Sequence, residues 1–259
     1  MLDCLSFWLH FFERMLVYCI QYSQLANVNI PGQRINIMLL FRSTVGRKIL
    51  VAISGQTMVL FVVAHLLGNT SIFIPGGINS YAEHLHAFPP LVWGVRFVMV
   101  AMVLIHIIFG IQVSLENRRA NPTSYAVNKK LKATFASQNM IWTGILLLFF
   151  IIYHLLHFTI RVMPDVATRL ASLSAGAQFD VYSMVVGSFR NGAIGAVYVA
   201  SMIVLFLHLL HGIQAFFQTM GWNNDRTLPV ISRVGRVLAI IFLVGYSSIP
   251  VFILARILT

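Results

Sequence analysis

Five long apolar segments recur along the chain, separated by more polar stretches that hold most of its charged residues. Each segment has about the 20 residues that an α-helix needs to cross a bilayer. The pattern therefore predicts an all-α integral membrane protein, a helical bundle with five transmembrane helices. The predicted spans are residues 46–68, 93–115, 139–161, 193–215 and 236–258.

The composition supports a membrane protein over a soluble domain. Of the 259 residues, 58% are hydrophobic and 10% are charged, and the mean hydropathy is +0.83. A soluble domain carries roughly 25% charged residues. The net charge of +11 does not indicate nucleic-acid binding, because the basic residues lie between apolar segments and form no soluble basic domain.

Lys and Arg concentrate before the first span and in the connections that follow the second and fourth spans. Basic connections stay on the cytoplasmic side of a membrane. We therefore predict a cytoplasmic N-terminus and an outer C-terminus. The residues that carry this prediction are Arg42, Arg47, Lys48, Arg118, Arg119, Lys129, Lys130, Lys132, Arg226, Arg233 and Arg236.

Residues 1–41 precede the five-helix domain of residues 42–259 and indicate no chemistry of their own. Their apolar run is too short and too charged for a span, and they lack the features of a signal peptide. Two interpretations stay open: an interfacial helix on the cytoplasmic side, or an artefact of the start site, with Met38 as the true start. Cys4 and Cys19 form no CxxC motif and indicate neither a disulfide framework nor a zinc site.

An internal repeat relates the first span to the third. FVVAHLLGNT in the first span aligns with FIIYHLLHFT in the third, which matches His65 with His154. A hydroxyl residue and a glycine precede the histidine in each span, with Gly55 matching Gly144. The repeat therefore places one histidine at an equivalent position in each of these two spans.

A second repeat relates the second span to the fourth. The shared pattern H-x-x-x-G-I-Q matches His106 with His208, and Gly110 with Gly212. Because each polar side chain is costly in hydrocarbon, the repeated placement of histidines favours a bound ligand. The glycines are candidates for contacts around it, since a missing side chain leaves room for a ring edge or for a neighbouring helix.

The predicted orientations place the two histidine pairs at different depths. His65 and His154 fall in the outer parts of their spans, and His106 and His208 in the inner halves, so the levels differ by roughly 15 Å. Zinc prefers four ligands, whereas a porphyrin iron needs only two axial ligands. Two stacked haems, an electron path across the membrane, are therefore the expected cofactors. No side chain indicates a catalytic nucleophile.

Two further histidines stand three residues after a predicted ligand, on nearly the same helix face. They are His157 and His211. For each of them a haem propionate, a quinone oxygen and a neighbouring helix remain open as hydrogen-bond partners.

At these residues the chain resembles the cytochrome b membrane subunit of the succinate dehydrogenase and fumarate reductase family, in its five-span, two-haem form. The resemblance covers residues 38–259. It implies an outer haem b on His65 and His154, and an inner haem b on His106 and His208. The first four helices would form the haem-binding bundle, with the fifth alongside. The motifs that carry it, in order, are RSTVGRK, AHLLGN, INSYAEHL, HIIFG, YHLLHF and LHLLHG with QTMGW.

The resemblance also implies partners and a place in the cell. A flavoprotein that interconverts succinate and fumarate and an iron–sulfur protein would dock on the cytoplasmic face of a bacterial inner membrane. The chain would not act on succinate itself; it would transfer electrons and bind menaquinone. Quinone chemistry needs a proton acceptor, and Glu83 with His84, in the outer connection after the first span, are the candidates.

Two other functions stay open at this point. A cytochrome b anchor of a hydrogenase or formate dehydrogenase also pairs intramembrane histidines around haem. A metal-ion transporter would use them for the ion, but it is expected to carry intramembrane carboxylates and broken helices. The sequence shows neither clearly.

Overall fold

A computed structural model of the chain describes residues 38–120, 134–165 and 180–259. The predictions for residues 1–37, including both cysteines, and for the lysines at 129, 130 and 132 lie outside the described residues. The chain divides into two units, residues 1–46 and 47–259. In the first unit, a short helix α2 (Met38–Arg42) precedes the start of α3.

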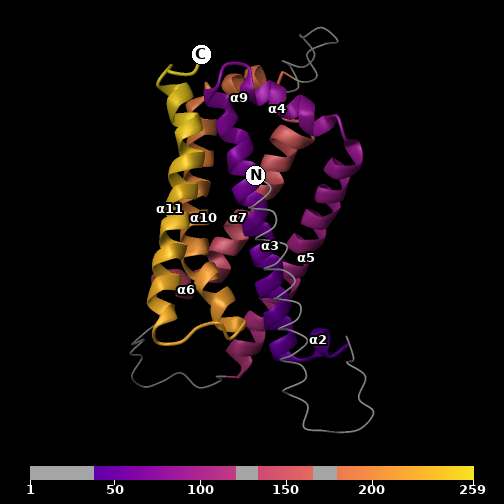
Figure 1. The fold of residues 1–259 in the computed structure, drawn as a ribbon, viewed down its shortest axis with the longest axis vertical. Coiled ribbons are helices and arrows are strands. Elements are labelled where there is room, and N and C mark those ends of the chain that lie inside the picture. Colours follow the sequence, from indigo (N-terminus) through magenta and orange to yellow (C-terminus); the bar gives the residue numbers. More distant parts are fainter. Residues whose placement is uncertain (1–37, 121–133, 166–179) are drawn as a thin grey trace. The chain divides into compact units, whose positions relative to one another are not determined.

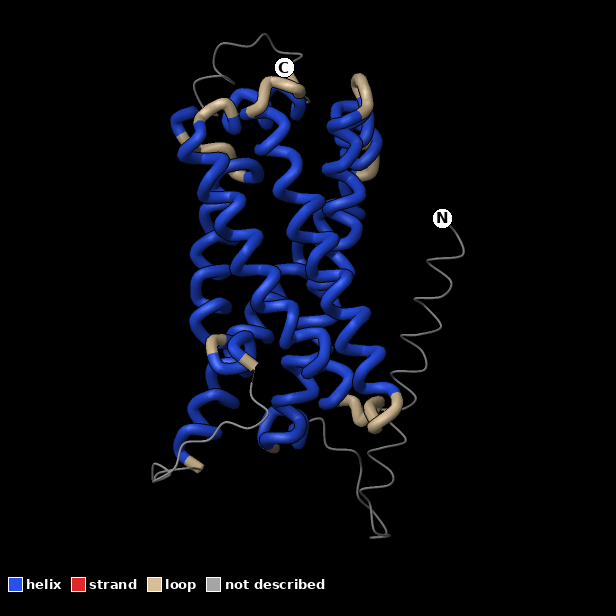
Figure 2. The backbone as a smooth tube through the Cα atoms, turned by 90° about the vertical axis from the view of Figure 1, so that its left-hand side faces the viewer, coloured by secondary structure: helices blue, strands red, loops and turns tan. Residues whose placement is uncertain are grey.

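Five helices in the described residues are long and apolar enough to cross a membrane, which confirms the predicted number of spans. Figures 1 and 2 show the long helices side by side, and the described residues contain no strand. The chain is therefore a multi-pass all-α membrane protein. The spanning helices are α3 (Thr44–Thr70), α5 (Pro89–Arg119), α7 (Met140–His154) with the π-helical turn η2 (Leu155–Thr159), α10 (Gly192–Thr219) and α11 (Thr227–Leu254).

Most helices extend beyond the predicted spans. The α5 helix begins at Pro89, because proline has no N–H to leave unpaired in a first helical turn. The prediction was wrong for Arg233 and Arg236, which lie inside α11 and not in the connection before it. Long arginine side chains can reach the polar interface from within a helix, so these charges do not end the helix.

Shorter helices fold over the end of the bundle where α3 ends and α10 begins (Figure 1). The connection that holds Glu83 and His84 is not an irregular loop but the helix α4 (Gly77–His86), preceded by a 3₁₀ turn η1 (Ser71–Phe73). Asn79 of α4 donates to Asp180 (3.1 Å). Asp180 in turn caps the N-terminus of α9 (Val181–Phe189) by accepting from the Ser183 N–H. At the opposite end, the single turn α6 (Phe135–Gln138) precedes α7.

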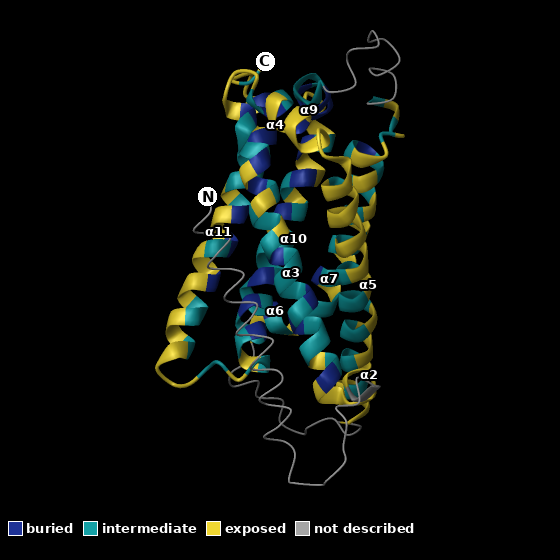
Figure 3. Ribbon diagram, turned by 45° about the vertical axis from the view of Figure 1, so that its right-hand side comes forward, coloured by how far each residue is buried: buried dark blue, intermediate teal, exposed yellow. Residues whose placement is uncertain are grey.

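The two last helices form the closest pair in the bundle. Ala239 and Phe242 of α11 are fully buried, and a Cβ on Gly235 would lie 3.1 Å from Ile213 of α10. The α11 helix also reaches α3, where the Tyr246 hydroxyl donates to the Val62 carbonyl (2.7 Å). By contrast, no residue of α5 is buried against the described residues, and Figure 3 shows this helix in yellow and teal, the colours of exposed and intermediate residues.

Candidate functional site

The outer pair of histidines comes together between α3 and α7. The ring centroids of His65 and His154 lie 5.9 Å apart, with their planes at 84°. Phe61 stacks on His65 with ring centroids 5.4 Å apart. The ring centroid of Tyr246, on α11, lies 6.1 Å from that of His65. The Nδ1 atom of His154 is 3.4 Å from the Tyr198 hydroxyl. The pairing predicted from the repeat is therefore the one that the structure shows.

The inner pair comes together between α5 and α10. The ring centroids of His106 and His208 lie 6.3 Å apart, with their planes at 63°. The Nδ1 atom of His106 lies 3.0 Å from the carbonyl of Val51 and 3.3 Å from the Ser54 hydroxyl. The Nδ1 atom of His208 lies 3.0 Å from the Thr143 hydroxyl. Hydrogen bonds from Nδ1 to the neighbouring helix thus fix both rings.

The first repeat has a structural meaning at this inner level. Ser54 and Thr143, the matching hydroxyl residues of α3 and α7, each lie at Nδ1 of the inner histidine on the next spanning helix in sequence. The glycine after each hydroxyl residue leaves room for the ring. A Cβ on Gly55 would lie 3.0 Å from Cε1 of His106, and one on Gly144 would lie 3.5 Å from Cε1 of His208.

The other two glycines of the repeat have different surroundings. A Cβ on Gly110 would meet nothing within 4 Å among the described residues, and one on Gly212 would lie 3.6 Å from Cε of Met140. The open space beside Gly110 lies where the repeat predicts room for a ring edge or a neighbouring helix.

The spacing of both pairs fits a metal ion held between two imidazoles. With metal–nitrogen bonds of about 2 Å, and about 1 Å more from each nitrogen to its ring centre, the centroids should lie about 6 Å apart. The observed spacings are 5.9 and 6.3 Å. Within the described residues, Nε2 of none of these four histidines forms a hydrogen bond, while Nδ1 of His106, His154 and His208 does. The spacing within each pair therefore leaves room for one metal ion between the two rings.

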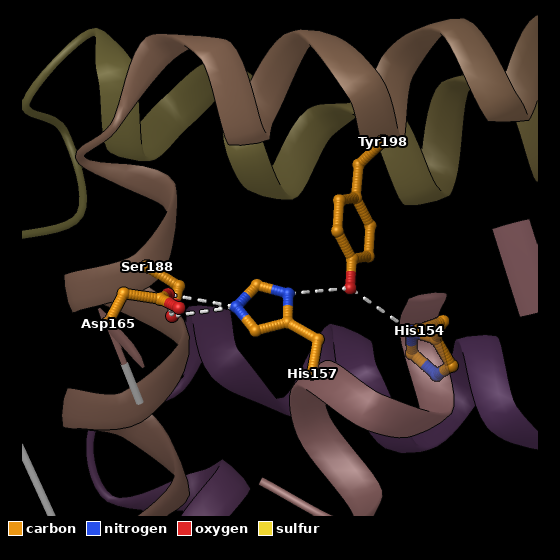
Figure 4. Close-up of polar contacts among 5 residues, drawn as sticks. All are labelled: His154, His157, Asp165, Ser188 and Tyr198. Atoms are coloured by element: carbon orange, nitrogen blue, oxygen red, sulfur yellow. Dashed lines mark hydrogen bonds and ion pairs between the residues drawn. The ribbon is translucent and has the colours of Figure 1, made fainter. Parts of the chain in front are cut away.

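His157 has helix neighbours as its hydrogen-bond partners. Its ring is fully buried; Nδ1 lies 3.0 Å from the Tyr198 hydroxyl, and Nε2 lies 2.9 Å from Oδ2 of Asp165 and 3.2 Å from Oγ of Ser188. Figure 4 shows that this chain of contacts continues through Tyr198 to His154. Both ring nitrogens are thus occupied without a propionate or a quinone.

The carboxyl group of Asp165, at the end of this chain of contacts, has a pKa below its usual value. The Asp165 side chain is 29% exposed. Partial burial alone would raise the pKa of Asp165, but hydrogen bonds from Ser188 and His157 outweigh this effect and lower it.

The remaining predicted residues lie apart from these contacts. His211 is partly buried and forms no hydrogen bond within the described residues. Glu83 and His84 are exposed on α4, and His84 donates from Nδ1 to the Ser80 carbonyl (2.7 Å). The structure does not bring Glu83 and His84 into contact with either histidine pair.

Sequence reasoning missed Tyr198, Tyr246, Asp165 and Ser188. The two tyrosines stand in apolar helices, where an aromatic residue is usually part of the packing. Asp165 and Ser188 are 8 and 31 residues from His157 in sequence, so no local pattern joins them. The one available signal was a carboxylate soon after the third span.

The chain matches a known protein family. The family described as "Succinate dehydrogenase/Fumarate reductase transmembrane subunit" matches residues 114–246, just over half of the chain. The matched segment includes His154 and His208, one histidine from each pair. No curated protein and no solved structure matches the chain.

Proposed function

Because the chain belongs to the family of succinate dehydrogenase/fumarate reductase transmembrane subunits, we propose that it is the dihaem cytochrome b anchor of a succinate:quinone oxidoreductase. Membership of the family implies association with the flavoprotein and iron–sulfur subunits of such a complex. The finer proposal is that the chain holds two b haems and carries electrons between the iron–sulfur subunit and menaquinone.

The paired histidines carry this proposal. Their centroid spacings of 5.9 and 6.3 Å suit one iron between each pair, and Nε2 is left without a hydrogen bond in all four. When bound, an iron between two imidazoles supplies one-electron exchange and has no open coordination position for oxygen. The protein's own part is to hold the rings of His106, His154 and His208 through Nδ1 and to keep water away with apolar side chains.

The distribution of basic residues supports the direction of the path. Arg47 and Lys48 at the start of α3, and Arg118 and Arg119 at the end of α5, mark the cytoplasmic side by the positive-inside rule. Arg47 also forms an ion pair with Glu116 (2.7 Å), which ties α3 to α5 at this end. His106 and His208 lie nearer this side, so the inner pair would receive electrons from the iron–sulfur subunit.

The test is reduction of the assembled complex by its substrate. Succinate, added without oxygen to the complex purified with its flavoprotein and iron–sulfur subunits, should reduce part of the haem b that dithionite reduces. Hydrogen and formate serve as controls. Reduction by either of them, with no effect of succinate, would contradict the proposal and favour the anchor of a hydrogenase or formate dehydrogenase.

The proposal for the quinone site rests on the acidic residue of α4. Glu83 is exposed near the outer end of the bundle, where a carboxylate can accept the proton that leaves during menaquinol oxidation. His84 stands beside it in sequence. We expect Glu83→Gln to slow menaquinol oxidation about 100-fold, the usual contribution of a positioned general base, with haem content unchanged.

The matched control for this prediction is Glu116→Gln. Glu116 lies near the C-terminal end of α5, far along that helix from α4, and its carboxylate forms the ion pair with Arg47. Stopped-flow measurement of haem reduction by a menaquinol analogue compares the two variants. A wild-type rate in Glu83→Gln, or an equal loss in Glu116→Gln, would exclude Glu83 as the acceptor.

The histidine-based metal-ion transporter has less support. The described residues contain no group of three or more His, Cys, Asp and Glu side chains that could hold a metal ion. The family match favours the electron-transfer subunit, and a purified chain with stoichiometric zinc or another free metal ion and no haem absorption would reverse this preference.

A further inference from the structure

The two levels of the site differ in what lies behind the axial histidines. At the inner level, the hydrogen bonds of Nδ1 end on neutral groups, the Val51 carbonyl and the Ser54 and Thr143 hydroxyls. At the outer level, His154 continues through Tyr198 and His157 to the carboxylate of Asp165. Only one of the four predicted ligands is thus connected to an anion by an unbroken chain of hydrogen bonds within the described residues.

This chain of hydrogen bonds has one consistent arrangement of protons when Nε2 of His154 binds a metal ion. Nδ1 then carries the proton of the neutral ring and donates to the Tyr198 oxygen (3.4 Å). The Tyr198 hydroxyl donates to Nδ1 of His157 (3.0 Å), and Nε2 of His157 donates to Oδ2 of Asp165 (2.9 Å). Every donor has an acceptor, and the last acceptor is ionised.

The local fold places His157 at the centre of this chain. The helix changes from α to π directly after His154, and the Ile160 N–H bonds the Leu155 carbonyl five residues earlier (2.7 Å). Such π turns inside helices occur frequently at functional sites. The turn sets the His157 ring against Phe158 (4.0 Å, stacked) and within reach of α9, which supplies Ser188.

Burial strengthens the electrostatic interactions along this chain of hydrogen bonds. His157 and Ser188 are fully buried, and Tyr198 is nearly so, so little water screens the polar groups. Ser188 donates to Asp165 (2.8 Å) and holds the carboxylate in place. A carboxylate that receives hydrogen bonds in such surroundings keeps its charge and polarises the groups that donate to it.

We propose that Asp165 and His157 are positioning residues that act through Tyr198 to make His154 a more electron-rich axial ligand, and so lower the reduction potential of the outer haem relative to an isolated bis-histidine site. The inference rests on the proposed function, since it requires a haem on His65 and His154. When the ring nitrogen that does not bind the metal donates a hydrogen bond, the basicity of a metal-bound histidine rises. A more basic ligand, and a nearby negative charge, stabilise ferric over ferrous iron.

The first test is the Asp165→Asn variant in the intact complex, measured by redox titration of the two haems. Removing the charge should favour the ferrous state of the outer haem. At a fixed potential we expect the ratio of oxidised to reduced iron in the outer haem to fall about threefold to tenfold, which corresponds to the free energy of one hydrogen bond. At 59 mV per tenfold for one electron, the midpoint rises by about 30–60 mV. The inner haem should keep its wild-type midpoint.

The matched control is Asp180→Asn. Asp180 is a second carboxylate at the same end of the bundle, but its hydrogen bonds go to Ser183 and Asn79 and not toward His154. Asparagine caps a helix as well as aspartate does, so α9 should keep its start. This variant should leave the outer midpoint unchanged, which separates the hydrogen-bonded chain from the effect of any lost charge.

A second variant tests the route itself. Tyr198→Phe keeps the ring but removes the hydroxyl that joins His157 to His154, and it should raise the outer midpoint as well. If Asp165 acts through this hydroxyl, the double variant should match Tyr198→Phe alone, because effects carried by one chain do not add. Additive shifts would mean that Asp165 acts through space, and would overturn the role of the chain.

The remaining outcomes also decide the matter. An unchanged outer midpoint in both single variants overturns the proposal, as does an equal shift of both haems. Loss of the outer haem in both variants overturns it too, because the chain would then hold the ligand in place and not tune it. A wild-type complex with no haem would instead refute the proposed function, and that result is visible before any variant is made.

Discussion

Replacing His208 with Ala is expected to remove the inner haem and to stop electron transfer from succinate to quinone. His208 supplies one of the two imidazoles paired at this level, and its ring centroid lies 6.3 Å from that of His106. Without it, His106 would have no paired ring. The remaining haem would lie roughly 15 Å farther from the inner face. We expect haem content to fall from two to one per chain and succinate:quinone activity to fall by about 100-fold or more.

The matched control for this variant is His211→Ala. His211 is on the same helix, one turn further, and forms no hydrogen bond within the described residues. Haem content by pyridine haemochrome and succinate-dependent quinone reduction are measured in both variants. Two haems retained in His208→Ala, or equal losses in the two variants, would show that the inner pair is not a haem site.

Replacing His65 with Ala is expected to interrupt the electron path at the level of the outer haem. The outer haem should be lost, because His154 would face no second imidazole. The inner site depends on α5, α10 and the hydroxyls of Ser54 and Thr143, so the inner haem should remain and stay reducible by succinate. Delivery of electrons to a quinone at the outer side should fall by about 100-fold or more.

Tyr246→Phe is the control for the His65 variant. It keeps the ring beside His65 but removes the hydrogen bond to the Val62 carbonyl, so it should retain both haems. Spectra after succinate and after dithionite separate the two variants. If succinate reduced no haem in His65→Ala, the assignment of the inner pair as the entry point would be wrong.

The spans and the histidine pairs could be predicted because each depends on a signal that is local in sequence. Uninterrupted apolar runs mark spans, and the repeat aligned His65 with His154 and His106 with His208 without any knowledge of the fold. Helix ends were harder to predict. Arg233 and Arg236 read as a basic connection, yet they lie in α11, because a long side chain lets a helix begin before its apolar part.

The contacts behind the histidines could be predicted only in part. Ser54 and Thr143 stood in the repeat as matching positions, but their role at Nδ1 of His106 and His208 depends on which helices meet. The partner of His157 was left open among three choices, since spacing alone gives a helix face and not what lies opposite it. Asp165 meets His157 beyond the π-helical turn that follows His154, and no sequence pattern indicated that turn.

The most direct test of the account is the haem content of the purified complex, measured by pyridine haemochrome together with low-temperature electron paramagnetic resonance. The account predicts two b haems per chain, each low-spin with two imidazole ligands, and each lost separately when His65 or His208 is changed to Ala. One haem per chain would contradict the two-level site. No haem at all would contradict the interpretation of the four histidines as axial ligands.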